Sequence, residues 1–468
     1  MVLPGLTLSR LVPRGVFFLV LVLALGCACA QPAGLAGTMP EDYLPELKNI
    51  LATALARSPK LIAAEYARAV SEARILGANA ARLPSVRGYS EYATNQTSAS
   101  GNNSSQSRAS GFFYRFEASQ ALFHWGALQN ESRAAQINLL VEQKNFSIAA
   151  RELGIELRKA YLALVVEKAK LRLGREALKL FRDDLTVLTE KNAAGAVSAA
   201  VLKGEELRAR EVALDLNRDE AEFAANLRRF ARLAGLAELP EEKIPAEIPR
   251  LEHRPELAAA MAAMLLRDGA KSTLEYQVYD MKVRVALLRE KIERTRLLPK
   301  INAGAGYSLE NNTDVNGNAV NQQAFRRQSL SIGAQWYIFD GFAAKAAVRE
   351  ALLNKRLQER ARDAKIEEKL QEVQILERML KNDAEGLEIA ETRRGIAVAG
   401  RGRVVDEVAL GNMPKGDVDR AQLGILQADA ANLAACAAYL GRWSDFVALA
   451  GDDPVLQNLP ARHVREKQ

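Results

Sequence analysis

The feature that most constrains this 468-residue chain is an internal repeat that covers nearly all of it. A Leu-Pro pair, a glycine at a strand–helix join, a second glycine in a helical break and a closing Leu-Ala-Gly recur in the same order. The offset is 215 residues at first (299 − 84) and 216 later (411 − 195). The matched pairs are Pro84 and Pro299, Tyr92 and Tyr307, Gly126 and Gly341, Gly195 and Gly411, and Gly235 and Gly451. Self-similarity at a fixed period indicates a duplicated structural unit.

Each copy predicts a helix, a strand pair with a long polar loop, a very long helix, a glycine-containing break and a returning helix. Pairing Pro59 with Pro255 predicts about 19 extra residues in the second copy, since 299 − 255 = 44 and 84 − 59 = 25. The predicted divisions are a signal peptide at 1–30, a first repeat at 41–240 (strand pair 84–122, helical hairpin 127–236), a Pro-rich linker at 241–254, a second repeat at 255–452 (strand pair 299–338, hairpin 343–450) and a tail at 453–468.

The N-terminus predicts export. Arg10 and Arg14 precede a short apolar run that ends in small residues, which is the pattern of a secretory signal peptide. Two processing sites are open: cleavage after Ala30 in "ACA", or a lipoprotein site in "ALGC" with lipid attached to Cys27. No later segment approaches 18 consecutive apolar residues, so the sequence predicts no membrane-spanning helix in the mature chain.

The strands alternate between apolar and polar residues, as half-buried strands do. Their length suits a tilted span of hydrocarbon, and the loops between them are long and polar. Four strands cannot close a barrel, but three chains would supply twelve. The residues expected to face lipid are Phe112, Tyr114, Phe116, Leu330, Ile332 and Trp336.

The segment from about 127 to 192 holds no proline, and neither does its counterpart from about 343 to 410. Roughly 65 helical residues make a rod of roughly 100 Å. The returning helices are expected at about 199–235 and 416–450, packed as antiparallel coiled pairs. The predicted fold class is therefore mainly α with a small β part, namely long helical hairpins with four strands per chain.

Bulk properties exclude several function classes. The formal charge of +7 falls to +5 without the two leader arginines, and both signs alternate along the helices, which argues against nucleic-acid binding. His124, His253 and His463 are scattered, and no metal-ligand or phosphate-binding motif is present. The sequence predicts neither an enzyme nor a cofactor, and Cys436 is expected to be a small buried hydrophobe.

In these motifs and their order the chain resembles the TolC-like outer-membrane efflux proteins. The resemblance rests on the Leu-Pro pairs, the joins at Gly126 and Asp340-Gly341, the helical breaks and the Leu-Ala-Gly ends. It implies a homotrimer in the bacterial outer membrane, with a twelve-stranded barrel in lipid and a helical periplasmic tunnel. It further implies a passive exit duct for an inner-membrane transporter, either an efflux pump or a type I secretion system, reached through a periplasmic adaptor.

The same resemblance assigns roles to particular residues. The hairpin tips at Gly195, Ser198, Gly411 and Pro414 would contact the adaptor, and Pro84, Gly126, Pro299, Asp340 and Gly341 would form the barrel–tunnel joins. Asp417 and Asp419 would lie at the tunnel entrance, although Arg420 departs from the acidic pattern of some members. A plain N-terminal helix charge is an equally open interpretation of Asp417.

Two other function classes stay open on the sequence. One is a periplasmic adaptor, although an adaptor carries one hairpin where this chain predicts two. The other is a structural coiled-coil protein without a pore. The sequence does not identify the cargo of a channel, whether drug, metal ion or polypeptide.

Overall fold

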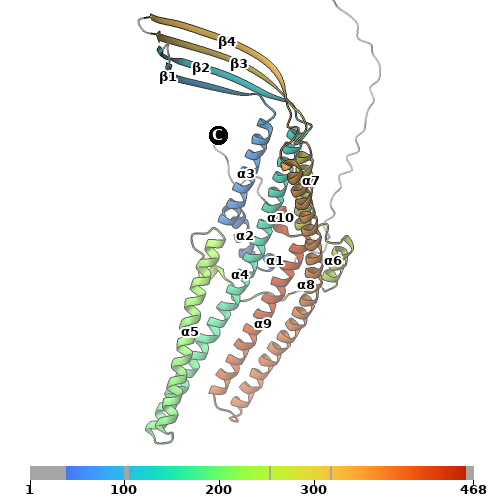
Figure 1. Cartoon of the computed structure of the whole chain (residues 1–468). Helices are drawn as coiled ribbons and strands as arrows, with labels where there is room; N and C mark the ends of the chain where they lie inside the picture. Colours follow the sequence, from blue (N-terminus) through green and yellow to red (C-terminus); the bar gives the residue numbers. More distant parts are fainter. Residues whose placement is uncertain (1–37, 100–104, 252–254, 317–318, 460–468) are drawn as a thin grey trace, which may run out of the picture. The chain divides into compact units, whose positions relative to one another are not determined.

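The computed structural model describes residues 38–99, 105–251, 255–316 and 319–459, which fall in one compact unit (Figure 1). The predicted signal peptide, Cys27 and the last nine residues of the tail lie outside this part. The helices are α1 (Pro40–Tyr43), α2 (Pro45–Arg57), α3 (Pro59–Ala80), α4 (Ala127–Ala193), α5 (Ala199–Leu233), α6 (Pro255–Asp268), α7 (Leu274–Arg294), α8 (Ala343–Ala409), α9 (Gly416–Ala450) and α10 (Pro454–Gln457), with a 3-10 turn η1 at Glu241–Lys243. The strands are β1 (Ser85–Ala99), β2 (Ser105–Phe123), β3 (Lys300–Asn316) and β4 (Ala319–Gln335).

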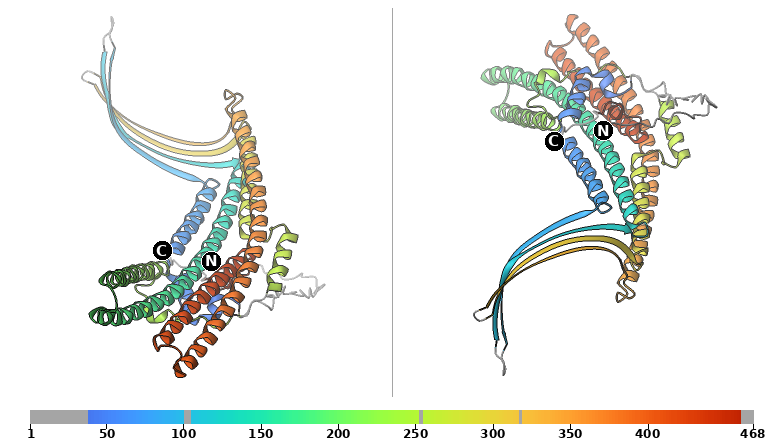
Figure 2. Two further views of the ribbon diagram at one scale, coloured as in Figure 1. Left: turned by 90° about the horizontal axis from the view of Figure 1, so that it is seen from below. Right: turned by 90° about the horizontal axis from the view of Figure 1, so that it is seen from above.

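The four strands form one antiparallel sheet in the order β1-β2-β3-β4. The strand pairs from the two copies meet through β2 and β3, while β1 and β4 are the edges. One irregularity interrupts the pairing of β2 with β3, between Ala121 and Phe123. Figure 2 shows that the strands curve together as a single sheet. The predicted fold class, long helical hairpins with four strands, is confirmed.

The two long helices, α4 and α8, have 67 residues each, and the returning helices α5 and α9 have 35 each. At 1.5 Å per residue the long helices reach about 100 Å. In Figure 1, α3 lies along the half of α4 nearer the sheet and α5 along the other half, and α7 and α9 divide α8 in the same way. Helix α4 also packs against α7 and α9, which joins the two copies.

The structure corrects the alignment of Pro59 with Pro255. Pro255 begins α6, whose 14 residues correspond to the 13 of α2, and the helix that begins at Pro59 corresponds to α7, with 22 and 21 residues. Helix α2 packs on α4 as α6 packs on α8. The copies therefore differ mainly in the connection, a single Ser58 against residues 269–273, and there is no insertion of about 19 residues. The proline match misled because prolines begin all three helices α2, α3 and α6.

The core lies midway along the helices, where the short N- and C-terminal helices pack against α4 and α9. Its largest buried side chains include Tyr161 of α4, Phe230 of α5, and Trp443 and Phe446 of α9. The rings of Tyr161 and Phe230 lie 5.7 Å apart, and the Tyr161 hydroxyl donates to the carbonyl of Lys243 in the linker. This contact fixes the linker between the repeats against the core.

Among the described helices, only α9 is long and apolar enough to cross a membrane by length and composition, with a mean hydropathy of 1.3 over its most apolar window. It packs along α8 and α4 as one arm of an antiparallel hairpin. Length and composition alone are weak evidence for a membrane span, because helices in protein cores meet the same criteria.

Candidate functional site

The strand register gathers apolar side chains on one face of the sheet. Directly opposite residues of antiparallel strands share a face, and Ala118 of β2 pairs with Ala305 of β3, which pairs with Leu330 of β4. Leu330 and Ile332 are 86% and 74% exposed. Counting along the strands in steps of two places five of the six predicted lipid-facing residues on this apolar face, namely Phe112, Tyr114, Phe116, Leu330 and Ile332.

The sixth, Trp336, lies just beyond the sheet. Strand β4 ends at Gln335, whose partner Lys300 is the first residue of β3. The next residue back, Pro299, has no N–H to donate, so the ladder stops there. The indole of Trp336 instead donates to the carbonyl of Leu297 at 2.9 Å. The predicted strand alternation through Ile338 is therefore wrong, and Trp336 belongs to the connection between sheet and helix.

Both joins between sheet and long helix use the same backbone turn. Trp125 and Gly126 have φ of 55° and 79°, and Gly341 and Phe342 have φ of 65° and 69°. Two consecutive left-handed residues form the type I′ turn, which suits glycine and asparagine. The structural equivalents are thus Trp125 with Gly341 and Gly126 with Phe342, an offset of 216 (341 − 125). The match of Gly126 with Gly341 was wrong by one residue, because each copy places its glycine at a different position of the turn.

The side chains at the two joins differ. Asp340 accepts a hydrogen bond from the Ala344 N–H at 2.8 Å and so caps the first turn of α8. Its equivalent in the first copy, His124, instead contacts Asn302 of β3 at 2.9 Å. Trp125 donates to the carbonyl of Pro299 at 2.8 Å, which holds its left-handed backbone.

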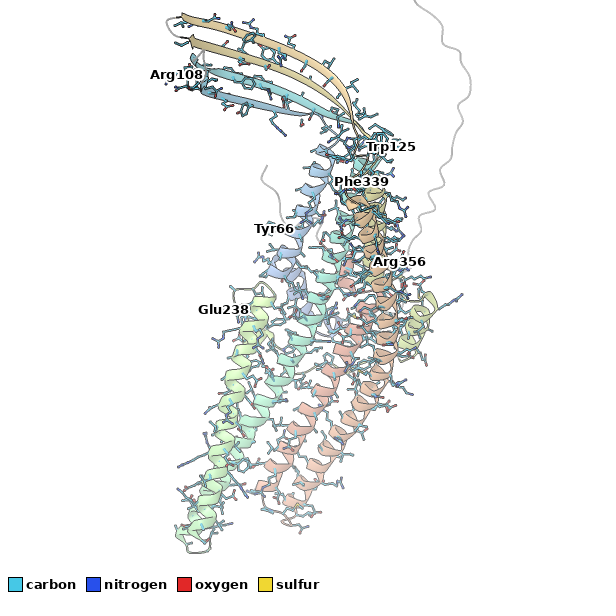
Figure 3. All side chains as sticks on the ribbon, viewed as in Figure 1. Tyr66, Arg108, Trp125, Glu238, Phe339 and Arg356 are labelled. Atoms are coloured by element: carbon cyan, nitrogen blue, oxygen red, sulfur yellow. The ribbon has the colours of Figure 1, made fainter. Side chains whose placement is uncertain are left out.

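Aromatic rings cluster where the sheet meets the helices. Phe123 lies 5.0 Å from Trp125, and Phe339 lies 5.3 Å from Phe342, both edge to face. Figure 3 shows Trp125 and Phe339 at this level, between the strands and the long helices. All four side chains are exposed. Exposed aromatic rings at the end of an apolar band are typical of the girdles that mark a membrane–water interface.

The two hairpin tips also repeat one geometry. Gly195 and Gly411 have φ of 73° and 81° and end α4 and α8. After each glycine, the next N–H bonds back to a carbonyl five residues earlier, from Ala196 to Lys191 and from Asn412 to Glu407, as in a Schellman cap. The side chain of Ser198 then accepts from the Val201 N–H and caps α5. Pro414 occupies the equivalent place before α9. The four predicted tip residues are thus exposed turn residues.

Near the second tip, Asp417 is not a free carboxylate. It accepts from Arg420 at 2.7 Å, and the other guanidinium nitrogen of Arg420 lies 3.4 Å from both carboxylate oxygens of Asp184 on α4. These bonds to Asp184 and Asp417 raise the pKa of Arg420. Asp419 lines a separate small groove between α4 and α9, with Asp183. The structure therefore brings together Asp417, Arg420 and Asp184, and leaves Asp419 outside the group.

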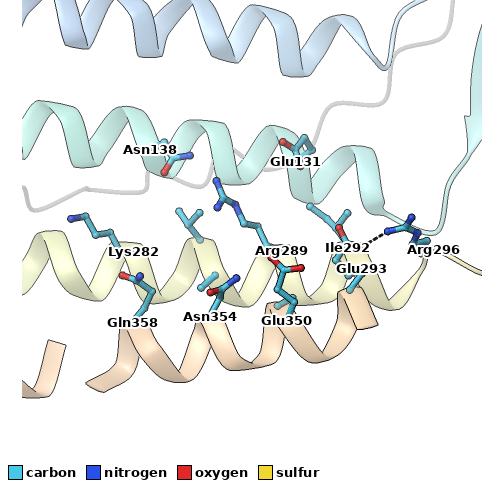
Figure 4. Close-up of a pocket in the computed structure, with 14 residues that line it drawn as sticks. Glu131, Asn138, Lys282, Arg289, Ile292, Glu293, Arg296, Glu350, Asn354 and Gln358 are labelled. Carbon is cyan, nitrogen blue, oxygen red and sulfur yellow. Dashed lines mark ion pairs between the residues drawn. The ribbon is translucent and has the colours of Figure 1, made fainter. Parts of the chain in front are cut away.

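A larger groove of about 660 Å³ lies between α4, α7 and α8, nearer the sheet (Figure 4). It mixes acidic and basic side chains, among them Glu131, Arg289 and Glu350. Glu293 and Arg296 form an ion pair of 3.6 Å at its edge. The balanced charge and open shape fit a hydrated helix surface and do not indicate a particular ligand.

A buried ion cluster escaped the sequence analysis. Arg158 of α4 is fully buried and binds Glu41 near the N-terminus and Asp453 before α10, with bonds of 2.6–2.9 Å. Ser444 of α9 accepts a fifth bond at 3.2 Å. Burial alone would lower the pKa of Arg158, but the two carboxylates raise it. In the sequence Arg158 is one of many helix arginines, and only its lack of exposure marks it.

Within the described residues no group of three or more His, Cys, Asp or Glu side chains could hold a metal ion. Cys436 is buried as expected, and burial raises the pKa of its thiol to about 11. A thiol with that pKa is protonated at neutral pH and is a poor nucleophile.

Comparison with known proteins connects this geometry to a family. Residues 50–236 match the outer membrane efflux protein family. No curated protein sequence matches the chain. The resemblance to TolC-like outer-membrane efflux proteins is confirmed. The same match confirms the predicted outer-membrane location with a periplasmic tunnel. The matched family is one of channels, which are not enzymes.

Solved structures of TolC-like channels share the fold over almost the whole chain. The CmeC outer membrane channel of Campylobacter jejuni is 15% identical, with a TM-score of 0.69, and the match covers 90% of this chain and 89% of CmeC. The open-state MtrE channel of Neisseria gonorrhoeae is 17% identical, with a TM-score of 0.63 and coverage of 90% and 91%. VceC of Vibrio cholerae is 14% identical, with a TM-score of 0.60 and coverage of 88% and 97%. Together with the family match, these findings support an outer-membrane efflux channel over a periplasmic adaptor or a coiled-coil protein without a pore.

Proposed function

We propose that the chain works as a homotrimer that forms a passive exit duct through the outer membrane. The observation that carries the proposal is the four-stranded sheet with an exposed apolar face and two edges, β1 and β4, that pair with no other described strand. Unpaired edges must be covered or paired. Three copies joined from β4 to β1 make a closed barrel of twelve strands, with the apolar face against lipid.

The helices offer a second surface for the same assembly. On α8, Ile375, Ile389 and Ile396 are exposed at multiples of seven residues. On α5, Leu207 and Leu214 are exposed seven residues apart. A seven-residue apolar repeat packs as a coiled coil. In the trimer, α8 of one chain would bury this stripe against α5 of the next and so close the tunnel wall.

The exposed tips are the proposed contact for a periplasmic adaptor. Gly195, Ser198, Gly411 and Pro414 set two turns of equal geometry, and Leu410 is 72% exposed beside the second. Because the chain shows no energy-coupling motif, an inner-membrane transporter, either an efflux pump or a type I secretion system, would drive export through the adaptor.

The entrance is proposed to lie at the second tip, where Arg420 links the two hairpins. Arg420 joins Asp417 on its own helix to Asp184 on α4. In a trimer these groups would form a ring in which each arginine bridges two carboxylates and leaves a net charge of −1. Opening would require the hairpins to separate and the exposed pair between Arg420 and Asp184 to break, which costs little.

Purified protein reconstituted in planar bilayers tests the channel. We expect large, stable conductance steps and a trimer in detergent. A monomer in detergent without such steps would contradict the proposal. It would favour a periplasmic adaptor or a structural coiled-coil protein instead. Drug sensitivity, metal tolerance and secreted proteins of a deletion strain would then identify the cargo class.

A further inference from the structure

The polar face of the sheet carries charges in layers. Across all four strands, Tyr89 pairs with Arg115, Arg115 with Ser308, and Ser308 with Arg327. This level, the arginine layer, contains two arginines and no acid. It is formed by four residues of one face, since direct partners in antiparallel strands point the same way.

Two residues further along each strand, toward the loops, the sign reverses. Glu91 pairs with Phe113, Phe113 with Glu310, and Glu310 with Phe325. This level, the glutamate layer, contains two glutamates and no base. Two residues of a strand span about 7 Å, so the two layers are about 7 Å apart along the strands.

Contacts within the sheet hold several of these side chains in place. The Arg115 guanidinium lies 4.9 Å over the ring of Phe113 and 3.5 Å from Glu117. The Tyr89 hydroxyl donates to Glu91. On the helix side, Glu117 pairs directly with Arg87, so the next level is balanced. The positive charge of the arginine layer and the negative charge of the glutamate layer are thus separated in space, and neither is cancelled within its own level.

The opposite face at the height of the arginine layer carries two large apolar side chains beside one serine and one arginine. Ser90 pairs with Tyr114, Tyr114 with Leu309, and Leu309 with Arg326. Arg326 and Arg327 are therefore neighbours in sequence that project from opposite faces. This pair provides a matched test of what each face contacts.

We propose that the arginine and glutamate layers line the barrel lumen and together set its selectivity; the inference rests on the proposed trimer. Two residues per layer in each of three chains give a ring of six arginines next to a ring of six glutamates. The rings lie within about one Debye length, roughly 8 Å at physiological salt, so each offsets the field of the other. The barrel passes small cations and anions with little preference. A zwitterionic solute whose charges lie about 7 Å apart contacts both layers favourably.

Reversal potentials in a KCl gradient test the layers. The variant Arg115→Gln/Arg327→Gln leaves the glutamates unopposed, and we expect the permeability ratio of potassium to chloride to rise by about twofold or more. The variant Glu91→Gln/Glu310→Gln is expected to lower that ratio by a similar factor. Arg326→Gln removes the same charge from the opposite face and is expected to leave the ratio unchanged.

Thiol labelling gives a second measurement. Arg327→Cys is expected to react with a charged methanethiosulfonate added in water and to change the conductance, whereas Arg326→Cys is expected not to. Cys436 is buried, and a Cys29→Ser background removes the thiol that a lipoprotein start at Cys27 would leave in the mature chain, so the new thiol is the reactive one. Two results would overturn the proposal that the layers line the lumen. One is an unchanged permeability ratio in both double variants with conductance steps of normal size, and the other is an equal effect of labelling at positions 326 and 327. A complete lack of conductance would contradict the channel itself.

Discussion

The two copies of the repeat have long and returning helices of equal length but different side-chain contacts. The long helices have 67 residues in each copy and the returning helices have 35, at an offset of 216. At equivalent positions, however, His124 stands where Asp340 caps α8, and Gly204 stands where Arg420 links the hairpins. The duplication therefore keeps the backbone turns and lengths, while the contacts that fix the termini and the entrance exist in one copy only.

The largest expected difference in stability is between a substitution of Arg158 and a substitution of its equivalent in the second copy, Gln374. Arg158→Met leaves Glu41 and Asp453 buried without a cation, which typically costs about 3–5 kcal/mol. We expect the variant to lose its heat-resistant trimer and its cooperative thermal transition, as measured by gel mobility and circular dichroism.

The matched variant Gln374→Met changes an exposed residue of α8 and is expected to alter stability by less than about 0.5 kcal/mol. Equal stability of the two variants would show that the buried cluster does not hold the terminal helices.

A smaller effect is expected at the joins. Gly341→Val forces a β-branched residue into a left-handed turn, although a Cβ there would meet open space, so the cost of about 1–2 kcal/mol is backbone strain alone. Impaired trimer assembly is expected from Gly341→Val, but not from Gly341→Asn, because asparagine tolerates this conformation. Normal assembly of the valine variant would show that the turn is not needed in the assembled barrel.

A pH-dependent contact joins the two copies. Burial would raise the pKa of Glu275 on α7, but Arg151 of α4 and Lys369 of α8 lower it below its ordinary value of 4.5. The stabilisation is complete above that value and is lost as the pH falls through the lowered pKa of the folded protein.

Thermal unfolding of the unmodified protein should therefore show a melting temperature that falls below pH 4.5. In Glu275→Gln this fall should be smaller, and the variant should be less stable than the unmodified protein at neutral pH. The same acid profile in both proteins would exclude Glu275 as a source of the dependence.

The smallest effect is expected at the entrance. Arg420→Ala removes an exposed pair worth up to about 1 kcal/mol, so the open population would rise by no more than about fivefold. Single-channel recording should show more frequent opening and stronger cation preference. Gly204→Ala, at the equivalent place in the first copy, should change neither, and an effect there as large as that of Arg420→Ala would contradict an entrance formed by the second copy.

Sequence patterns are sufficient to predict the type and bounds of elements with a clear period. Helix α4 was expected from 127 to about 192 and ends at Ala193, because nothing in the segment interrupts helix formation. The predicted strand pair 299–338 ran three residues too far, because an indole contact of Trp336 and the missing N–H of Pro299 end the ladder at Gln335. The joins were misaligned by one residue because glycine takes either place in a turn with two left-handed residues.

The ion clusters required the structure. Arg158 and its carboxylates are separated by 117 and 295 positions, and Arg420 and Asp184 by 236, so no local spacing marks them. Arg420 was noted in the sequence only as a departure from an acidic pattern. Its role as the link between hairpins depends on the packing of α4 against α9.

The equal length of α4 and α8 restricts how such a chain can change. Deleting one residue from α4 alone would turn its tip by about 100° and draw it back by about 1.5 Å relative to the tip of α8. Its apolar stripe would then face away from its neighbours along the rest of the helix. Insertions and deletions should therefore be tolerated only as whole seven-residue repeats that are gained or lost in both copies together.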